Sequence, residues 1–130
     1  MDHAHVIPPS GGTPWIVDGD VVICKADLQL VEPHLQIFVV ESGRNAGQSP
    51  HTHPWDEVVV VLDGELELQT SNEIHLVVRG AVGVVPAGSI HGFRTISETS
   101  RYLAITSTDR AAGFYAEMSN NTNNTQSRDQ

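Results

Sequence analysis

The sequence is short of the features that mark disulfide-linked or membrane-spanning proteins. Cys24 is its only cysteine, so no disulfide can form within the chain, and a reducing cytoplasmic setting is expected. No apolar run approaches the roughly 20 residues that span a bilayer. The N-terminus also lacks the basic and apolar regions of a secretory signal. We therefore expect a cytoplasmic protein with no membrane partner.

Positive charge and aromatic side chains are scarce as well. Lys and Arg number 7 against 16 Asp and Glu, which gives a net charge of -9. This charge repels the phosphates of nucleic acids and anionic lipids, so we expect neither as a partner. Aromatic residues make up 5% of the 130 residues, so aliphatic side chains must fill the core. Valine dominates them, and its branching at the β carbon favours strands.

Short apolar segments separated by turn residues make up most of the chain. Asp63-Gly64, for example, predicts a hairpin turn between residues 57–62, which are apolar on both faces, and residues 65–69, which alternate polar and apolar side chains. The pattern predicts strands at 15–17, 21–25, 34–41, 57–62, 65–69, 74–78, 81–85, 90–96 and 101–107. About eight short strands at such spacing predict an all-β protein, an antiparallel sandwich or barrel.

The two ends of the chain lack this strand pattern. Residues 1–14 are rich in Pro, Gly and His, and we expect an irregular, solvated arm in which His3 and His5 bind no metal. Residues 119–130 are almost entirely polar and are expected to form a disordered tail. One domain is therefore expected at residues 15–118.

A single helical pattern covers residues 110–118, where Thr108 or Asp109 can cap the helix. Phe114 and Tyr115 lie at helical spacing with Met118. These aromatic side chains can contact a cofactor or pack the helix on the barrel, and we favour packing.

Residues 51–57, His-Thr-His-Pro-Trp-Asp-Glu, are the most informative stretch. On an extended backbone His51, His53 and Glu57 point to one face, provided that Pro54 does not break the alternation. Two imidazoles and a carboxylate can hold a divalent transition metal with positions left open. Trp55 can gate such a site or pack beneath it, and the sequence does not separate the two.

This stretch and a later one resemble the two motifs of the cupin superfamily. The first motif is matched by Gly47, His51, His53, Glu57 and Gly64, with Gly47 closer to His51 than is usual. The second is matched by Gly80, Pro86, Gly88 and His91, with Thr95 in place of the usual Asn. The resemblance implies a jelly-roll β-barrel that holds one divalent metal per chain, with His51, His53, Glu57 and His91 as its ligands. Fe(II), Mn(II), Ni(II), Cu(II) and Zn(II) all suit these ligands.

The motif is also similar to single-domain cupins of the quercetin 2,3-dioxygenase-like kind. This resemblance implies a dioxygenase-like oxidoreductase that acts on a small oxygen-rich substrate such as an enol, a diol or a diketone. Glu57 is then a fixed ligand or a catalytic base that takes a substrate proton. The alternatives are a non-redox cyclase, isomerase or lyase with a polyketide-like substrate, and a non-catalytic cupin that binds a small molecule.

Two other observations concern the outside of the barrel. His75 lies opposite the apolar face formed by Ile74, Leu76 and Val78, so we expect it outside the barrel. His34 lies at the start of a strand, and the sequence does not decide whether it faces inward or outward. If Glu57 points inward, the aliphatic side chains of the same strand at 58, 60 and 62 point outward. A large exposed aliphatic patch is unusual on a monomer, so we predict a homodimer. Cover by a second sheet or by the N-terminal arm is the alternative.

Overall fold

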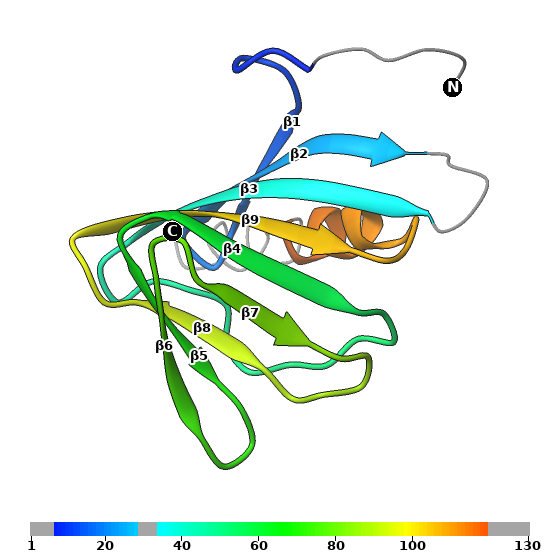
Figure 1. Cartoon of the computed structure of the whole chain (residues 1–130). Helices are drawn as coiled ribbons and strands as arrows, with labels where there is room; N and C mark the ends of the chain where they lie inside the picture. The colour runs from blue at the N-terminus through cyan, green and yellow to red at the C-terminus, as the bar shows by residue number, and fades with distance from the viewer. Residues whose placement is uncertain (1–6, 29–33, 120–130) are drawn as a thin grey trace, which may run out of the picture.

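The computed structural model describes residues 7–28 and 34–119, which form nine strands and one helix. The strands are β1 (Thr13–Val17), β2 (Asp20–Leu28), β3 (Leu35–Gly43), β4 (Glu57–Asp63), β5 (Glu65–Gln69), β6 (Ile74–Val78), β7 (Val82–Val85), β8 (Gly92–Thr95) and β9 (Thr99–Thr106). The helix covers residues 111–119. Figure 1 shows the strands in two layers that meet along one side of the molecule.

The strands pair only in antiparallel fashion, in two sheets. The larger sheet has the order β1-β2-β3-β9-β4-β7, and the smaller has the order β6-β5-β8. Neighbours within a sheet are often distant in sequence, since β9 lies between β3 and β4. The result is a jelly-roll β-sandwich, so the predicted all-β fold is confirmed.

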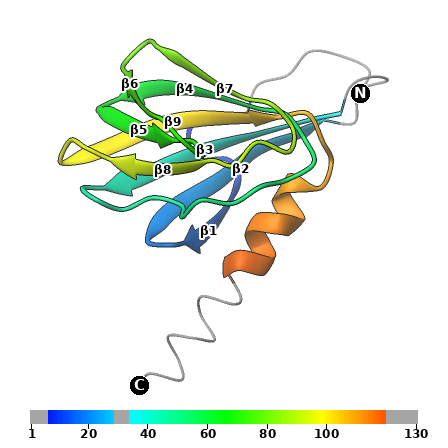
Figure 2. The ribbon, with the colours of Figure 1, turned by 90° about the horizontal axis from the view of Figure 1, so that it is seen from below.

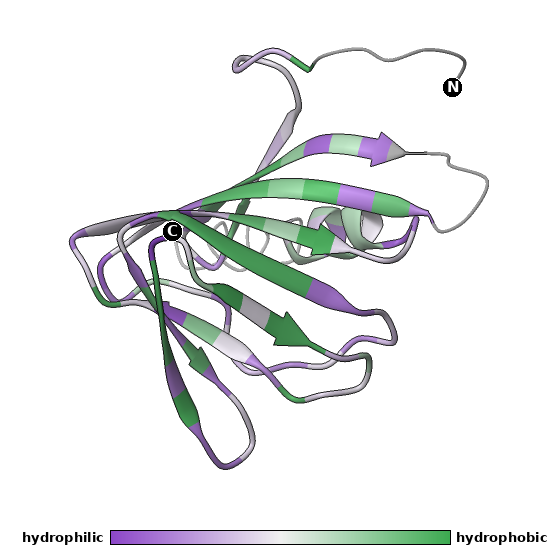
Figure 3. Ribbon diagram, viewed as in Figure 1, coloured by the Kyte–Doolittle hydropathy of each residue, from purple (hydrophilic) through white to green (hydrophobic). Residues whose placement is uncertain are grey.

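The core lies between the two sheets and is mostly aliphatic. Along β4, Val59 and Val61 are buried while Val58 and Val60 are only half-buried, as expected for a strand whose alternate residues face inward. Figure 3 shows β4 and β7 as almost entirely hydrophobic strands. Glu57 begins β4 on the same inward face as Val59 and is 2% exposed. The sheet thereby places a carboxylate inside one end of the sandwich.

Several strand boundaries differ from the sequence prediction, and two of them extend strands into segments where no strand was expected. β2 continues to Leu28 through a bulge between Cys24 and Ala26, where we expected irregular structure after residue 25. β1 begins at Thr13, inside the segment expected to be an irregular arm. In both cases pairing with a neighbouring strand extends the β structure beyond the apolar residues that signal it.

The orientation of β6 corrects the sequence interpretation. His75 is exposed, as expected, but Ile74, Leu76 and Val78 are also 70%, 58% and 43% exposed. Val77 instead faces the core and is 5% exposed. An alternating pattern identifies two faces of a strand, and the surrounding structure decides which face is covered.

The helix packs on the sandwich, as predicted. The Thr108 hydroxyl accepts a hydrogen bond from Arg110 N at 3.1 Å just before the helix begins. Tyr115 packs edge-on against Phe38, with ring centroids 4.9 Å apart. Figure 2 shows the helix beside the end of the sandwich where β4 begins. No helix among the described residues is long and apolar enough to cross a membrane. The predicted polar tail falls almost entirely outside the described residues.

Candidate metal centre

The loop before His51 is tied to the segment that carries His91. The backbone N–H of each of these histidines donates to the carbonyl of the other, at 2.8 and 3.0 Å. Phe93 N donates to Gln48 O at 2.9 Å, and Gly88 N donates to His53 O at 2.9 Å. These bonds bring the two motifs side by side although about 40 residues separate them in the sequence.

Gly47 makes this close approach possible. Its φ of 151° is unusual for residues with a side chain, and a Cβ atom there would collide with the carbonyl oxygen of Phe93. Glycine is therefore required both for the backbone conformation and for the space. The sequence motif reflects this contact between loop and strand.

The imidazoles of His51, His53 and His91 gather at one point. Their ligand atoms all lie within 4.8 Å of one another. Donor atoms that share one ion lie within about 4 Å of each other because metal–nitrogen bonds are about 2.0–2.1 Å long. The cluster therefore has close to the size that one ion needs.

Glu57 flanks this cluster, as the sequence predicted, but for a different geometric reason. Its Oε1 lies 3.0 Å from Nε2 of His53 and 3.9 Å from Nε2 of His91. Residues 52–56 form no strand, so the alternation of an extended backbone does not bring Glu57 and His53 together. A bend at Pro54-Trp55 returns the chain, and Glu57 then meets His53 from the start of β4.

The other ring nitrogen of each histidine determines which nitrogen faces the cluster. Nδ1 lies 2.7 Å from Ser49 O in His51, 3.0 Å from Trp55 O in His53 and 2.9 Å from Ser89 O in His91. A carbonyl oxygen only accepts hydrogen bonds, so each Nδ1 carries the hydrogen. Each neutral ring then presents the lone pair of Nε2, the arrangement that backbone carbonyls impose on metal-binding histidines.

His91 shows the consequence most clearly. Its side chain is 1% exposed, and its Nε2 has no hydrogen-bond partner. Burial lowers the pKa of His91, while the Ser89 carbonyl and the Glu57 carboxylate oppose this shift. A neutral, buried and unpartnered nitrogen is costly unless a cation satisfies it. The residues present therefore fit a metal ion.

Two aromatic residues shield the histidines from solvent. Trp55 is 7% exposed and stacks on His53, with ring centroids 4.6 Å apart and planes at 7°. Trp55 therefore packs beside the site. Phe114 of the helix lies 5.9 Å from the His51 ring and 5.7 Å from the Trp55 ring. Helical spacing predicts that Phe114 packs on the barrel. It does not predict contact with the histidines, because spacing along a helix does not identify the residues that the helix contacts.

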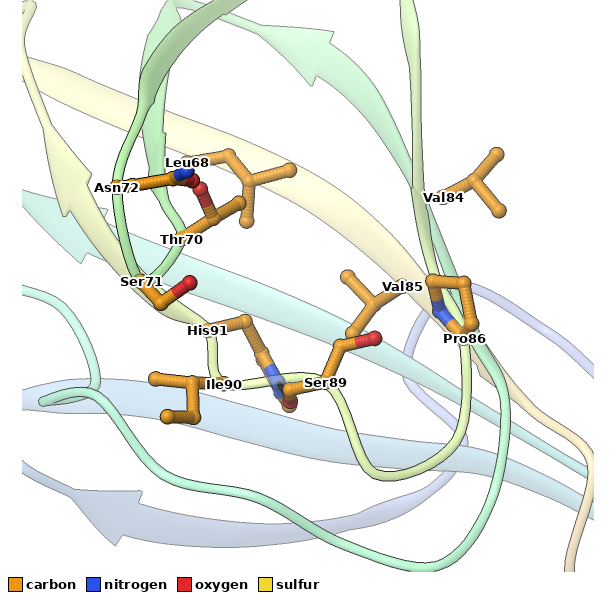
Figure 4. Close-up of a pocket in the computed structure, with 10 residues that line it drawn as sticks. All are labelled: Leu68, Thr70, Ser71, Asn72, Val84, Val85, Pro86, Ser89, Ile90 and His91. Atoms are coloured by element: carbon orange, nitrogen blue, oxygen red, sulfur yellow. Dashed lines mark hydrogen bonds between the residues drawn. The ribbon is translucent and has the colours of Figure 1, made fainter.

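A pocket of about 310 Å³ lies beside the cluster and has His91 among its lining residues. Its lining combines aliphatic, hydroxyl and amide groups around His91: Leu68, Thr70, Ser71, Asn72, Val84, Val85, Pro86, Ser89, Ile90 and His91. Figure 4 shows Thr70, Ser71 and Asn72 of the β5–β6 connection on one side of His91 and Val85 and Pro86 on the other. His51, His53 and Glu57 do not line this pocket, and the His91 side chain is 1% exposed.

The two other histidines that the structure describes, His34 and His75, are not part of the cluster. His34 is exposed and lies 3.8 Å from Asp109, and His75 is exposed and lies 3.2 Å from Glu73. His3 and His5 lie outside the described residues.

Residues 36–106 match the family model of the cupin domain. Over 86 residues the chain is 30% identical to quercetin 2,3-dioxygenase from Bacillus subtilis (strain 168). The alignment covers 65% of this chain and 26% of that protein, so the chain spans about a quarter of its relative's length.

Solved structures show the same fold. An RmlC-like cupin from Shewanella frigidimarina has a TM-score of 0.68 at 17% identity, and the match covers 81% of this chain and 91% of that one. The polyketide cyclase RemF from Streptomyces resistomycificus has a TM-score of 0.65 at 22% identity, covering 82% of this chain and 78% of that one. At these identities the likeness establishes the fold alone.

Proposed function

This chain belongs to the cupin family, and from that premise we propose that it is a metal-dependent, dioxygenase-like oxidoreductase. Its substrate would be a small oxygen-rich molecule such as an enol, a diol or a diketone. His51, His53, Glu57 and His91 would hold one divalent transition metal.

One observation carries this proposal. Three imidazoles present Nε2 lone pairs to one point because backbone carbonyls hold each Nδ1–H. A carboxylate oxygen, which also only accepts, lies beside them. In the described site, three imidazole lone pairs and a carboxylate therefore face one another with no hydrogen-bond donor between them. A divalent cation bound at this point would offset their repulsion.

The ligand set supports several reactions, and the metal would supply Lewis acidity and, if redox-active, the electron transfer that dioxygen chemistry needs. The chain's own residues have separate tasks. The Ser49, Trp55 and Ser89 carbonyls orient the rings, and Trp55 and Phe114 exclude water. Glu57 completes the ligand set or takes a proton from the substrate.

The side pocket supports a small substrate. A volume of about 310 Å³ lies at the lower end of the range of small-molecule sites, which is roughly 300–1,000 Å³. Leu68, Val84 and Ile90 offer an apolar surface, while Thr70 and Ser71 offer hydroxyl groups. An apolar ring or chain that carries oxygen atoms matches this lining.

The similarity to a quercetin 2,3-dioxygenase favours oxygenase chemistry over the alternatives. The same donors also suit Zn(II) or Ni(II), so a non-redox cyclase or isomerase with a polyketide-like substrate is the second candidate. A cupin that binds a small molecule without turnover is the third.

Metal content and oxygen uptake test the proposal together. Protein purified without added metal should contain about one redox-active metal per chain, and it should consume O2 with at least one member of a panel of enols, diols and diketones. Bound Zn without O2 uptake would instead favour the cyclase or isomerase. Binding of a panel compound without turnover would favour the third candidate.

A pair of histidine variants tests the site itself. His91→Ala should abolish stoichiometric metal binding, whereas His75→Ala, which removes an exposed imidazole, should leave it unchanged. Equal metal content in the two variants would refute the assigned ligands.

A further inference from the structure

β6 is an edge strand with an unusual surface. It pairs only with β5, and no strand among the described residues covers its other edge. Its outward side chains are the exposed aliphatic residues Ile74, Leu76 and Val78. Proteins commonly protect such edges with charges, proline or a covering element, because an uncovered apolar edge pairs with other chains.

The backbone groups on this edge follow from the β5–β6 hairpin. Thr70 N donates to Glu73 O at 2.9 Å beside the turn, and hydrogen-bonded pairs alternate along an antiparallel ladder. In the register of β5 and β6, His75 and Val77 therefore direct their backbone groups to β5. The N–H and C=O groups of Ile74 and Leu76 and the N–H of Val78 point to the uncovered edge, while the Val78 carbonyl accepts a hydrogen bond from Ala81 N at 2.8 Å in the turn after β6.

The sequence of β6 is complementary to itself in the antiparallel direction. When two copies pair with Leu76 opposite Leu76, Ile74 lies opposite Val78, and the residues with outward backbone groups meet one another. The same register places Glu73 of each copy opposite Arg79 of the other, so two pairs of opposite charges flank the apolar centre. A shift of two residues in either direction would lose both charge pairs, and one of the two shifts would place Val78 opposite Asn72.

We propose that β6 is a homodimer interface, in which the β6 strands of two copies pair antiparallel around a two-fold axis at Leu76. The two small sheets then form one continuous sheet, and the contact is the same on both copies, as a two-fold interface requires. A groove of about 370 Å³ lies beside β6 and is lined by His75, Leu76 and Val77 and, on β7, by Val82, Gly83 and Val84. The partner strand would cover the exposed Val82 and Val84 along this groove.

This interface differs from the one that the sequence suggests. Val58 and Val60 do face outward from β4, but they are half-buried, and Leu62 is 38% exposed. The side chains of β6 expose more of their surface and lie on an uncovered strand edge. The outer face of β4 remains as the competing interface in the test.

Charge substitutions at the proposed two-fold axis test the pairing, with mass measured by light scattering during size-exclusion chromatography. Wild-type protein should be a dimer. Leu76→Glu and Leu76→Lys should each place like charges opposite one another and raise the dissociation constant at least about 100-fold. An equimolar mixture of the two variants should form a heterodimer, because Glu and Lys then meet at the axis. The exposed position of Leu76 makes both variants compatible with folding.

Variants elsewhere exclude a general effect of surface charge. Arg79→Glu should weaken the dimer, and the double variant Glu73→Arg with Arg79→Glu should restore it. Ile16→Lys changes an exposed apolar residue on β1 and should leave the dimer intact. A monomeric wild type, or a dimer that resists Leu76→Glu but dissociates with Leu62→Lys, would overturn the proposal.

Discussion

Nε2 of His53 and Oε1 of Glu57 lie 3.0 Å apart, and both side chains are almost completely buried. The Trp55 carbonyl holds the hydrogen of His53 on Nδ1, so a neutral His53 directs a lone pair at the carboxylate. Two acceptors at this distance repel each other unless a proton or a metal ion lies between them. The pair therefore couples the stability of the site to the cation that it binds.

Glu57→Gln should separate metal binding from folding. The Gln amide can donate to Nε2 of His53, so the metal-free variant should melt at a higher temperature than metal-free wild type. Its metal affinity should fall by roughly 10–100-fold because a neutral amide replaces the carboxylate. Thermal unfolding after chelation and a competitive metal titration measure the two effects. Retained metal affinity with lost turnover would assign Glu57 the role of a base.

Glu67→Gln is the matched control for this variant. Glu67 is also buried, but its Oε2 pairs with Arg94 at 2.6 Å on the small sheet. The control should lower the melting temperature and leave metal affinity unchanged.

Gln36→Leu should loosen the helix that shields the histidines. The fully buried Gln36 amide donates to Asp109 O at 3.2 Å and accepts from Ala112 N at 2.9 Å. Loss of both bonds leaves two backbone groups unsatisfied, so the free energy of unfolding should fall by roughly 2–4 kcal/mol. Hydrogen exchange in residues 111–119 should accelerate. Gln69→Leu, on β5, should change neither quantity by as much.

Asp20→Asn should stabilise the protein at neutral pH. Burial raises the pKa of Asp20 to about 6 from 3.8; the neighbouring Ser42 hydroxyl opposes this shift, and the nearby Asp18 adds to it. The Ser42 hydroxyl is directed mainly to the Gly43 carbonyl, so both buried carboxylate oxygens of Asp20 lack a well-formed hydrogen bond among the described residues. The folded state thus holds this proton more tightly than the unfolded state, so wild type loses stability as pH rises from about 4 to 6.

At pH 8 the Asp20→Asn variant should exceed wild type by roughly 1–3 kcal/mol in the free energy of unfolding, and at pH 4 the difference should shrink. Urea denaturation at both pH values measures this. The exposed Asp63→Asn should show no such pH dependence, and an equal gain at both pH values would contradict the assignment to Asp20.

Two motif glycines should differ sharply when each is replaced by alanine. Gly47→Ala forces a Cβ into the Phe93 carbonyl. It should lower the free energy of unfolding by more than about 3 kcal/mol or prevent folding. Gly80→Ala meets no atom within 4 Å and retains only the strain of its φ of 84°, so it should cost about 1 kcal/mol. Thermal and urea unfolding measure both. Similar losses in the free energy of unfolding for the two variants would show that backbone strain alone explains the requirement for glycine.

Local patterns in the sequence predicted the strands well. The strands predicted at 57–62 and 65–69 correspond to β4 and β5. The hairpin predicted at Asp63-Gly64 was wrong, because β4 and β5 lie in different sheets and the chain passes from one sheet to the other there. The resemblance to cupins is confirmed by the family match, and the structure brings His51, His53 and His91 together. Such features can be predicted because turn residues and the two-residue period of strands depend on near neighbours.

The partners of individual side chains could not be predicted in this way. Nothing local to Gln36 indicates that its amide meets the start of a helix about 75 residues later. The burial of Asp20 could not be predicted from the sequence either, because aspartate beside glycine indicates an exposed turn.

The sequence by itself determined the periodicity of this protein, the positions of its turns and the spacing of its histidines. Tertiary structure alone decided which face of β6 meets solvent, that Phe114 covers His51, and which nitrogen of each imidazole faces the cluster. The physical reason is that burial and hydrogen-bond partners are set by segments that are distant along the chain. The spacing of side chains along the sequence does not identify the distant segments that cover them.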